Sequence, residues 1–235
     1  MKRKKAGAGA KAVISAKAEI ASAFSTFLVP LHSFLAFCKL LAGAAVQAAG
    51  RSGKGVMEAV QSVVEFWRSA GPRRWFARDD AFDDDFRRRF LDLHYRAARR
   101  GCEEWLHSAD GALALQILLD QFPRNCFRGT AHSFATDGLA RHYAMRTIEE
   151  GLDRELTPQL RAFIYLPFEH SEDPQDQERS VAMFEVLGDL EYLRFAELHR
   201  DIIRRFGRFP HRNAVLGRIP TPEELHFLAE GGFAG

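Results

Sequence analysis

The chain has 235 residues, of which 46% are hydrophobic and 27% are charged. This composition is typical of a soluble globular protein and excludes a chain that is disordered throughout. The formal net charge of +2 is too small to indicate nucleic-acid binding by the whole molecule. The three cysteines, Cys38, Cys102 and Cys126, are scattered. Their number excludes a disulfide framework and a zinc ribbon, and favours a reducing compartment such as the cytoplasm.

The charges divide the chain into two regions. All seven lysines lie at or before Lys54, and every later basic residue is an arginine. Residues 1–57 carry a net charge of +8, whereas residues 58–235 carry a net charge of −6. This contrast predicts a basic, alanine-rich extension (1–56) and a separate domain (57–235), with a glycine-rich linker near Gly50–Gly55.

Three interpretations of the basic extension remain open. Its apolar stretch suggests a membrane anchor, but Pro30 and His32 interrupt that stretch before it reaches the length of a spanning helix. Its basic, acid-poor character also suits contact with an anionic membrane surface or a partner protein. The third interpretation is a dispensable extension in front of the folded domain.

Helices are expected to begin near residues 57, 80, 110, 131, 158, 174 and 189, and the second of them carries the clearest pattern. Phe82, Phe86 and Phe90 recur every four residues and continue into further apolar positions, which is the spacing of one helix face. Aspartates at 79 and 80 are suited to capping its start. Gly101 follows its end.

The remaining chain also has helical spacing. Residues 113–119 are apolar on nearly all sides, which predicts a buried central helix, and a further helix is expected over 131–150. Thr157-Pro158 and Thr221-Pro222 are typical helix starts, and Gly188 is expected to divide a long helical region. Strand signals are nearly absent. The sequence therefore predicts an all-α fold of stacked antiparallel helical hairpins.

Three segments combine a proline with a neighbouring phenylalanine and polar residues: 120–125, 166–172 and 208–213. Because the residue before a proline disfavours helical geometry, each segment is expected to end a helix. The three segments follow alternate helices of the predicted array, so we expect them to meet at one end of the molecule.

The predicted cluster supplies residues suited to binding and to acid-base chemistry. Its members are Asp120, Arg124, Asn125, Arg128, Glu169, His170, Glu172, Arg208, His211, Arg212 and Asn213. Arginine guanidinium groups match carboxylate or phosphate oxygens, so Arg124, Arg208 and Arg212 are the predicted anion clamps. Glu169 is the predicted acid or base, with His170 and His211 as its partners, and Asp120 is the predicted orienting residue.

Two other interpretations of these residues stay open. Glu169 and Glu172 with His170, His199 or His211 are also ligand types that hold a divalent metal. Alternatively, the charged residues form a structural ion-pair network between loops. The sequence contains no phosphate-binding loop, dinucleotide fingerprint or nucleophile elbow, and it indicates no particular cofactor.

Cys126 lies between two cationic side chains, Arg124 and Arg128, and neighbouring cations lower a thiol pKa. A free cysteine more often behaves as a small buried hydrophobe. A buried, inert thiol is therefore the favoured interpretation.

The same three segments carry a family resemblance. The blocks that carry it are Leu118–Asn125, Phe127–Thr130, Tyr165–Glu172 and Arg205–Asn213, preceded by Phe66-Trp67, Trp75-Phe76 and Phe82-Asp83. Over about residues 60–230 the chain resembles the bacterial domain-of-unknown-function family 924. The resemblance implies an all-helical fold similar to tetratricopeptide-repeat superhelices and supplies no activity. Residues 1–56 lie outside it, and the tail Gly231-Gly232-Phe233 departs from the small polar ending expected of the family.

Two functions of different kinds follow from the sequence. The first is a polar pocket that binds a small acidic ligand or supports acid-base or metal-assisted hydrolysis. The second is a non-enzymatic helical scaffold that binds a peptide or protein in a concave groove. Because the distinctive residues lie near helix ends, the pocket is preferred.

Overall fold

The computed structural model describes residues 53–233, and the predictions for residues 1–52 lie outside the described part. Contacts divide the chain into two units, and the unit considered below begins at Val56. Residues 53–70 form one helix. Gly53 and Gly55, which fall in the expected glycine-rich linker, are helical because helical neighbours outweigh the weak helix propensity of glycine.

The described chain is all-helical, as predicted, with no strand between residues 53 and 233. After helix 53–70 the α-helices are α3 (Pro72–Trp75), α4 (Asp80–Ala98), α5 (Ala109–Gln116), α6 (Phe122–Cys126), α7 (Asp137–Glu149), α8 (Pro158–Glu169), α9 (Pro174–Leu187), α10 (Leu190–Phe206) and α11 (Pro222–Ala229). Short 3-10 helices connect some of them: η1 (Glu103–His107), η3 (Ala131–Phe134), η4 (Leu152–Glu155) and η5 (Pro210–Arg212). A π-helix, η2 (Ile117–Gln121), joins α5 to α6.

Local sequence signals fix several helix ends. The Asp79 carboxylate accepts a hydrogen bond from the Phe82 amide at 3.1 Å and so caps α4. Thr221 and Glu224 form the predicted reciprocal capping box at the start of α11. Gly188 adopts a left-handed conformation with φ of 79° and separates α9 from α10, as predicted.

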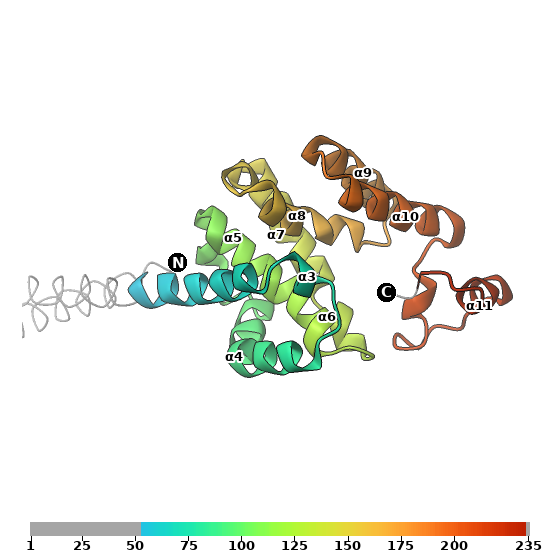
Figure 1. Cartoon of the computed structure of the whole chain (residues 1–235), viewed down its shortest axis with the longest axis horizontal. Coiled ribbons are helices and arrows are strands. Elements are labelled where there is room, and N and C mark those ends of the chain that lie inside the picture. Colours follow the sequence, from blue (N-terminus) through green and yellow to red (C-terminus); the bar gives the residue numbers. More distant parts are fainter. Residues whose placement is uncertain (1–52, 234–235) are drawn as a thin grey trace, which may run out of the picture. The chain divides into compact units, whose positions relative to one another are not determined.

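The main hydrophobic core surrounds α5, whose residues are nearly all buried. The indole of Trp67 in helix 53–70 contacts Phe86 of α4 and Phe163 of α8, with ring centroids 5.6 and 5.3 Å apart. Helices α7, α8, α9 and α10 pack consecutively against one another (Figure 1). Through Trp67, helix 53–70 therefore packs against both α4 and α8.

Two of the three prolines do not break the helix in which they lie. The chain stays helical through Pro123, near the start of α6, and through Pro167 inside α8. Pro123 is tolerated because side chains bond the carbonyls that its missing amide hydrogen leaves without a donor. Helix α8 ends inside the second segment, two residues after Pro167, and Gly207, with φ of 71°, terminates α10 before Pro210.

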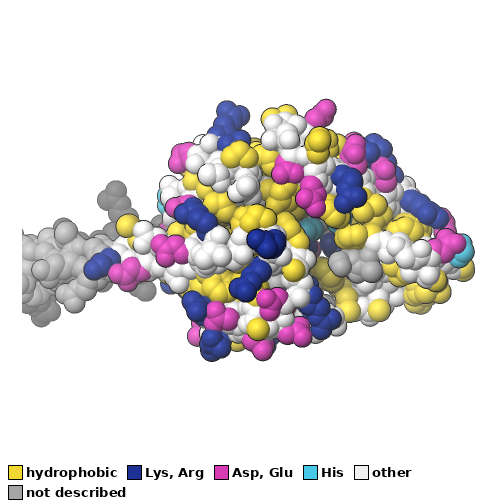
Figure 2. Space-filling model, in the orientation of Figure 1, with side chains coloured by type: hydrophobic (Ala, Val, Ile, Leu, Met, Phe, Trp, Pro, Cys, Tyr) yellow, Lys and Arg dark blue, Asp and Glu magenta, His cyan; other side chains and the backbone are white. Residues whose placement is uncertain are grey.

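The described surface carries charges of both signs. On the face shown in Figure 2, Lys/Arg and Asp/Glu side chains are interspersed, with no large patch of a single sign over the described residues. In the described range, no helix combines the length and the apolar character needed to cross a bilayer.

Candidate functional site

The π-helical turn η2 places Asp120 inside the molecule. The Phe122 amide donates to the carbonyl of Ile117, five residues earlier, and Pro123 has no amide hydrogen to donate. The carbonyls of Leu118 and Leu119 therefore accept hydrogen bonds from side chains instead, namely His94 Nδ1 at 2.8 Å and the Thr136 hydroxyl. Such π-turns occur often at functional sites.

Asp120 is the centre of a buried polar cluster. Its side chain is fully buried and accepts hydrogen bonds from His170 Nδ1 at 2.8 Å and from Gln121 Nε2 at 2.6 Å. Arg124 Nη1 forms an ion pair with Asp120 Oδ1 at 2.9 Å. Burial alone would raise the pKa of Asp120, but Arg124 and His170 outweigh it and lower the pKa to about 2. The Asp120 carboxylate is therefore ionised at neutral pH.

His170 follows the last residue of α8 and is held by Asp120. Burial, together with Arg124, lowers the pKa of His170, while Asp120 opposes the shift. The imidazole is therefore neutral at pH 7, and its Nδ1–H donates to Asp120. This tautomer leaves Nε2 with a lone pair, as in a general base oriented by a carboxylate. The side chain of His170 keeps 14% of its exposure.

Asp137, at the start of α7, joins two arginines from distant segments. Its carboxylate accepts two hydrogen bonds from Arg124, at 2.9 and 3.0 Å, and one from Arg212 Nη1 at 3.5 Å. Arg212 Nη2 donates to the carbonyl of His170 at 3.0 Å. The guanidinium of Arg212 lies 4.5 and 4.4 Å from the ring centroids of Phe134 and Phe209. The structure thus brings the three predicted segments together.

Glu169 is buried beside His199 of α10. Glu169 Oε1 lies 3.3 Å from His199 Nδ1, which also donates to the Phe195 carbonyl at 2.8 Å. Burial, with a contribution from the charge of Asp120, raises the pKa of Glu169 to about 8. Burial lowers the pKa of His199 to about 3. Both groups are therefore uncharged at neutral pH, with Glu169 protonated.

Three buried polar atoms of this cluster have no hydrogen-bond partner among the described residues. They are Glu169 Oε2, His211 Nδ1 and Arg212 Nε. Only 3% of Glu169 and 6% of Arg212 is exposed. Each unpartnered group costs on the order of 1–3 kcal/mol, so each of these atoms requires an explanation.

The other predicted site residues lie outside this cluster. Asn125 and Arg128 contact Asp83 of α4, with distances of 2.6 and 3.2 Å to its two carboxylate oxygens. The remaining pairs are Glu172 with Arg218, at 2.8 Å for each of two hydrogen bonds, and Arg208 with Glu224, at 2.6 and 2.8 Å. Asn213 is buried close to Glu224 and contributes to the lowered pKa of that carboxylate. Arg208 is thus an ion-pair partner of α11 and does not point into the cluster.

The described residues offer no metal centre. No group of three or more His, Cys, Asp or Glu side chains between residues 53 and 233 is arranged to hold a metal ion. Glu172, a proposed ligand, is neutralised by Arg218, and Asp120 by Arg124. The metal alternative therefore lacks a ligand set in this part of the chain.

The thiol of Cys126 is half-buried, whereas the sequence favoured a buried one. Burial, with the nearby charge of Asp83, raises its pKa to about 12. A thiol with this pKa stays protonated at neutral pH. It therefore does not serve as a nucleophile.

A separate surface groove of about 740 Å³ lies along helix 53–70 and α4. Phe66 and Phe82 line it together with charged residues of both signs, including Glu65, Asp85 and Arg89. No buried, unpartnered polar atom lies among its lining residues. The groove therefore differs from the buried cluster, because charged surface residues line it.

The sequence did not point to Asp137 as a member of the cluster. It pointed to His199 only as a possible metal ligand. An aspartate in the first turn of a helix has an ordinary structural explanation, because it interacts favourably with the helix dipole. Nothing local in the sequence indicates that Asp137 bridges Arg124 and Arg212, which lie 13 and 75 residues away along the chain.

Two comparisons with other proteins agree with this description. The family model described as "Bacterial protein of unknown function (DUF924)" matches residues 63–232. A solved structure, a protein of unknown function (ATU0120) from Agrobacterium tumefaciens, is similar, with 54% sequence identity and a TM-score of 0.72. The match covers 73% of this chain and 97% of that one. No curated protein matches the chain. The chain therefore belongs to the bacterial family of unknown function DUF924.

Proposed function

We propose that the buried cluster is an acid-base site that acts on a small acidic compound. In this proposal Glu169 is the general acid, His170 is the general base and Asp120 orients His170. Arg212 interacts with the negative charge of the substrate. The observation that carries the proposal is the buried Glu169 with an unpartnered Oε2, next in the chain to a His170 that Asp120 holds at 2.8 Å.

The opposite pKa shifts of Glu169 and His170 support this division of roles. A carboxyl group with a pKa near 8 still carries its proton at pH 7, whereas a histidine with a lowered pKa has already lost its own. An acid and a base are thus both in their active forms at the same pH.

Hydrolysis is the reaction class that uses both groups. His170 Nε2 removes a proton from water while the water oxygen attacks the substrate. Glu169 Oε2 gives its proton to the leaving atom, whose bond to the substrate breaks. His170 then returns its proton through solvent to Glu169, which restores both groups.

The unpartnered donors favour an acidic substrate. At neutral pH both Arg212 Nε–H and the protonated Glu169 Oε2–H need acceptors. A carboxylate or phosphate group supplies several acceptor oxygens and a charge that suits the guanidinium.

The first experiment measures hydrolysis of phosphate monoesters, and of esters and amides that carry a free carboxylate. Glu169→Gln and His170→Gln should each lower kcat by about 100-fold or more, the usual contribution of a general acid or base. Arg208→Gln is the matched control, because it breaks an arginine–carboxylate pair outside the cluster. Activity in both variants equal to that of the wild type would rule out these roles.

The pH dependence gives a second test. Activity should rise as His170 loses its proton and fall as Glu169 loses its own near pH 8. In Glu169→Gln any remaining activity should keep the acidic limb and lose the alkaline one. An alkaline limb that persists in this variant would assign the acid to another residue.

The second candidate function is a tetratricopeptide-like scaffold that binds a peptide. The consecutive packing of α7 to α10 supports such an arrangement, and the groove along helix 53–70 and α4 is its candidate surface. One variant distinguishes the two candidate functions. Arg89→Glu in the groove should abolish peptide binding and leave hydrolysis unchanged.

The free thiols of Cys102 and Cys126 support a reducing, cytoplasmic location for the protein. Fractionation of the cells that make it tests this proposal. Recovery with the membrane fraction would instead favour the anchor or surface-contact interpretation of residues 1–56.

A further inference from the structure

We propose that Phe233 is a gate over the histidine side of the candidate site, and that the short segment 231–233 moves to open it. The physiological meaning of this gate rests on the proposed acid-base function. The gate itself is a property of the described chain and is testable without a substrate.

Phe233 lies directly against two histidines of the site. Its ring centroid is 4.6 Å from that of His199 and 5.4 Å from that of His211, both in edge-to-face orientation. These two imidazoles are themselves close to Phe209, at 5.4 and 5.6 Å. Phe233 therefore completes an aromatic enclosure next to Glu169 and His170.

The two glycines before Phe233 shape the turn that returns it to the site. Gly231 has φ of 82°, which side chains other than glycine rarely adopt. Gly232 donates to the Phe227 carbonyl at 2.9 Å, and a Cβ atom on Gly232 would lie 2.5 Å from that oxygen. Neither position accepts a side chain without a shift. The sequence Gly-Gly-Phe, which departs from the expected family ending, thus has a defined geometric role.

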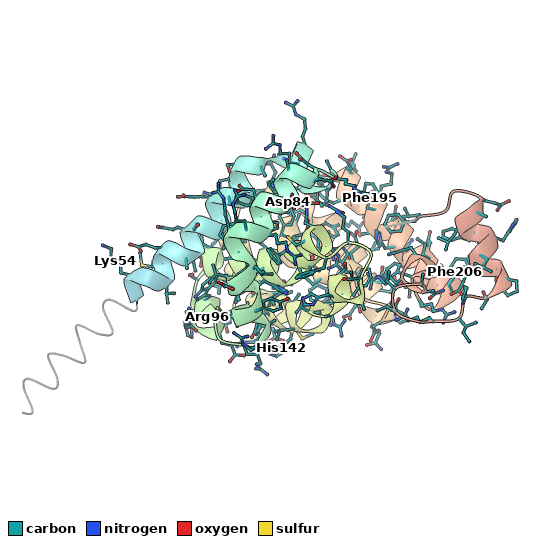
Figure 3. The ribbon with its side chains drawn as sticks, turned by 90° about the horizontal axis from the view of Figure 1, so that it is seen from below. Lys54, Asp84, Arg96, His142, Phe195 and Phe206 are labelled. Atoms are coloured by element: carbon teal, nitrogen blue, oxygen red, sulfur yellow. The ribbon has the colours of Figure 1, made fainter. Side chains whose placement is uncertain are left out.

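The gate belongs to a small hydrophobic cluster that is separate from the main core. Ile202, Ile203 and Phe209 form its buried part, and Phe206, Phe227 and Phe233 pack against them. The ring centroid of Phe206, a residue labelled in Figure 3, lies 5.1 Å from that of Phe227 of α11. Movement of residues 231–233 disturbs this small cluster and leaves the core around α5 unchanged.

The attachment of α11 to the body is compatible with such movement. Its main packing partner is η5. Two ion pairs also attach α11: Glu224 pairs with Arg208 at 2.6 Å, and Glu223 pairs with Arg205 at 2.9 Å. The second pair is exposed and contributes little to stability. The helix therefore holds the base of segment 231–233 through the amide hydrogen bonds of Gly231 and Gly232, while the end of the segment is held by the Phe233 ring.

The test compares histidine reactivity in the full chain and in Phe233→Ala. Diethyl pyrocarbonate acylates accessible neutral imidazoles, and peptide mass spectrometry assigns each site. We expect His211 and His199 to react several-fold faster in the variant, with His226, whose side chain is 67% exposed, as the internal reference. Leu225→Ala, an exposed position on α11, is the matched control and should leave all rates unchanged.

Histidine titration by NMR gives an independent readout. Burial lowers the pKa of His211 to about 4, so removal of the covering ring should raise this pKa toward the ordinary value of 6.5. Gly232→Ala keeps the phenylalanine but displaces it, and should act in the same direction. Phe233→Leu keeps an apolar cover and should resemble the wild type.

Two outcomes overturn the gate. One is unchanged reactivity and titration of His199 and His211 in Phe233→Ala. The other is increased reactivity that appears only together with faster hydrogen exchange over residues 222–229, because the cause would then be unfolding of α11. Neither result depends on hydrolysis, so failure of the gate is distinguishable from failure of the acid-base function.

Discussion

Asp120 and Glu169 are two buried carboxyl groups of one cluster with opposite ionisation. Asp120 has Arg124 and His170 as direct partners, and its pKa falls to about 2. The direct partner of Glu169 is the neutral His199, and the charge of Asp120 further disfavours its ionised form, so its pKa rises to about 8. The difference arises from neighbours, because both side chains are buried.

The raised pKa of Glu169 makes stability depend on pH. The folded state keeps the Glu169 proton up to about pH 8, whereas the unfolded chain loses it near pH 4.5. Between these values the folded state binds more protons, so the free energy of unfolding falls as the pH rises, by about 1.4 kcal/mol per pH unit from this group. Below pH 4.5 the contribution is complete, and above about pH 8 it is lost.

Urea unfolding of the wild type and Glu169→Gln from pH 5 to pH 9 tests this linkage. The amide is neutral throughout, so the variant should gain stability relative to the wild type as the pH rises, and the difference should level off above pH 8. A constant difference would show that Glu169 ionises with an ordinary pKa.

At the residue scale the sequence predicted the members of the cluster better than their partners. Asp120, Arg124, His170 and Arg212 meet as expected. Arginine and carboxylate residues have many possible partners, and the choice among them depends on helix packing. Arg208 therefore pairs with Glu224 on a helix whose position the pattern did not reveal.

At the element scale the informative feature is the π-turn before Pro123. Capping residues, apolar stripes and glycines between helices predicted most helix ends, because each acts locally. The prolines misled the prediction, since their effect depends on whether other groups satisfy the carbonyls they leave without a donor. Here the Thr136 hydroxyl donates to the Leu119 carbonyl, which has no amide donor at Pro123.

This exchange of donors predicts a rescue. Thr136→Val should lower the free energy of unfolding by about 1–3 kcal/mol, because the buried Leu119 carbonyl loses its partner. In a Pro123→Ala background the same substitution should cost less, since the amide of residue 123 becomes able to donate to that carbonyl. A double-mutant cycle of urea unfolding measures the difference. If the two substitutions change the free energy of unfolding additively, the missing amide of Pro123 is not the reason that the Leu119 carbonyl needs the Thr136 hydroxyl.

At the scale of the whole molecule, the core shows where a truncated chain should remain stable. Val63, Val64 and Trp67 of helix 53–70 are almost fully buried in the main core. A chain that starts at Gly53 should therefore melt at the same temperature as the full chain, whereas one that starts at Arg68 should not fold cooperatively. Circular dichroism melting tests both. A lower melting temperature for the Gly53 chain would contradict a dispensable extension.

The all-helical class follows from apolar spacing, which depends on the chain's own periodicity. The meeting of three distant segments followed from the alternation of helix directions. The bridging role of Asp137 and the cover provided by Phe233 depend on how helices rotate and where a tail returns. Neither of these two features produces a periodic pattern in the sequence.

The bridge through Asp137 also bears on how the protein is made. Asp137 joins Arg124 to Arg212, so its second partner emerges from the ribosome only after the residues of the main core, which end at Ala196. A nascent chain, or a product whose translation stops before Arg212, has the helices around α5 and lacks the complete cluster. Synthesis through Arg212 is thus the step that completes the cluster, and copies that end earlier should lack the bridge between Arg124 and Arg212.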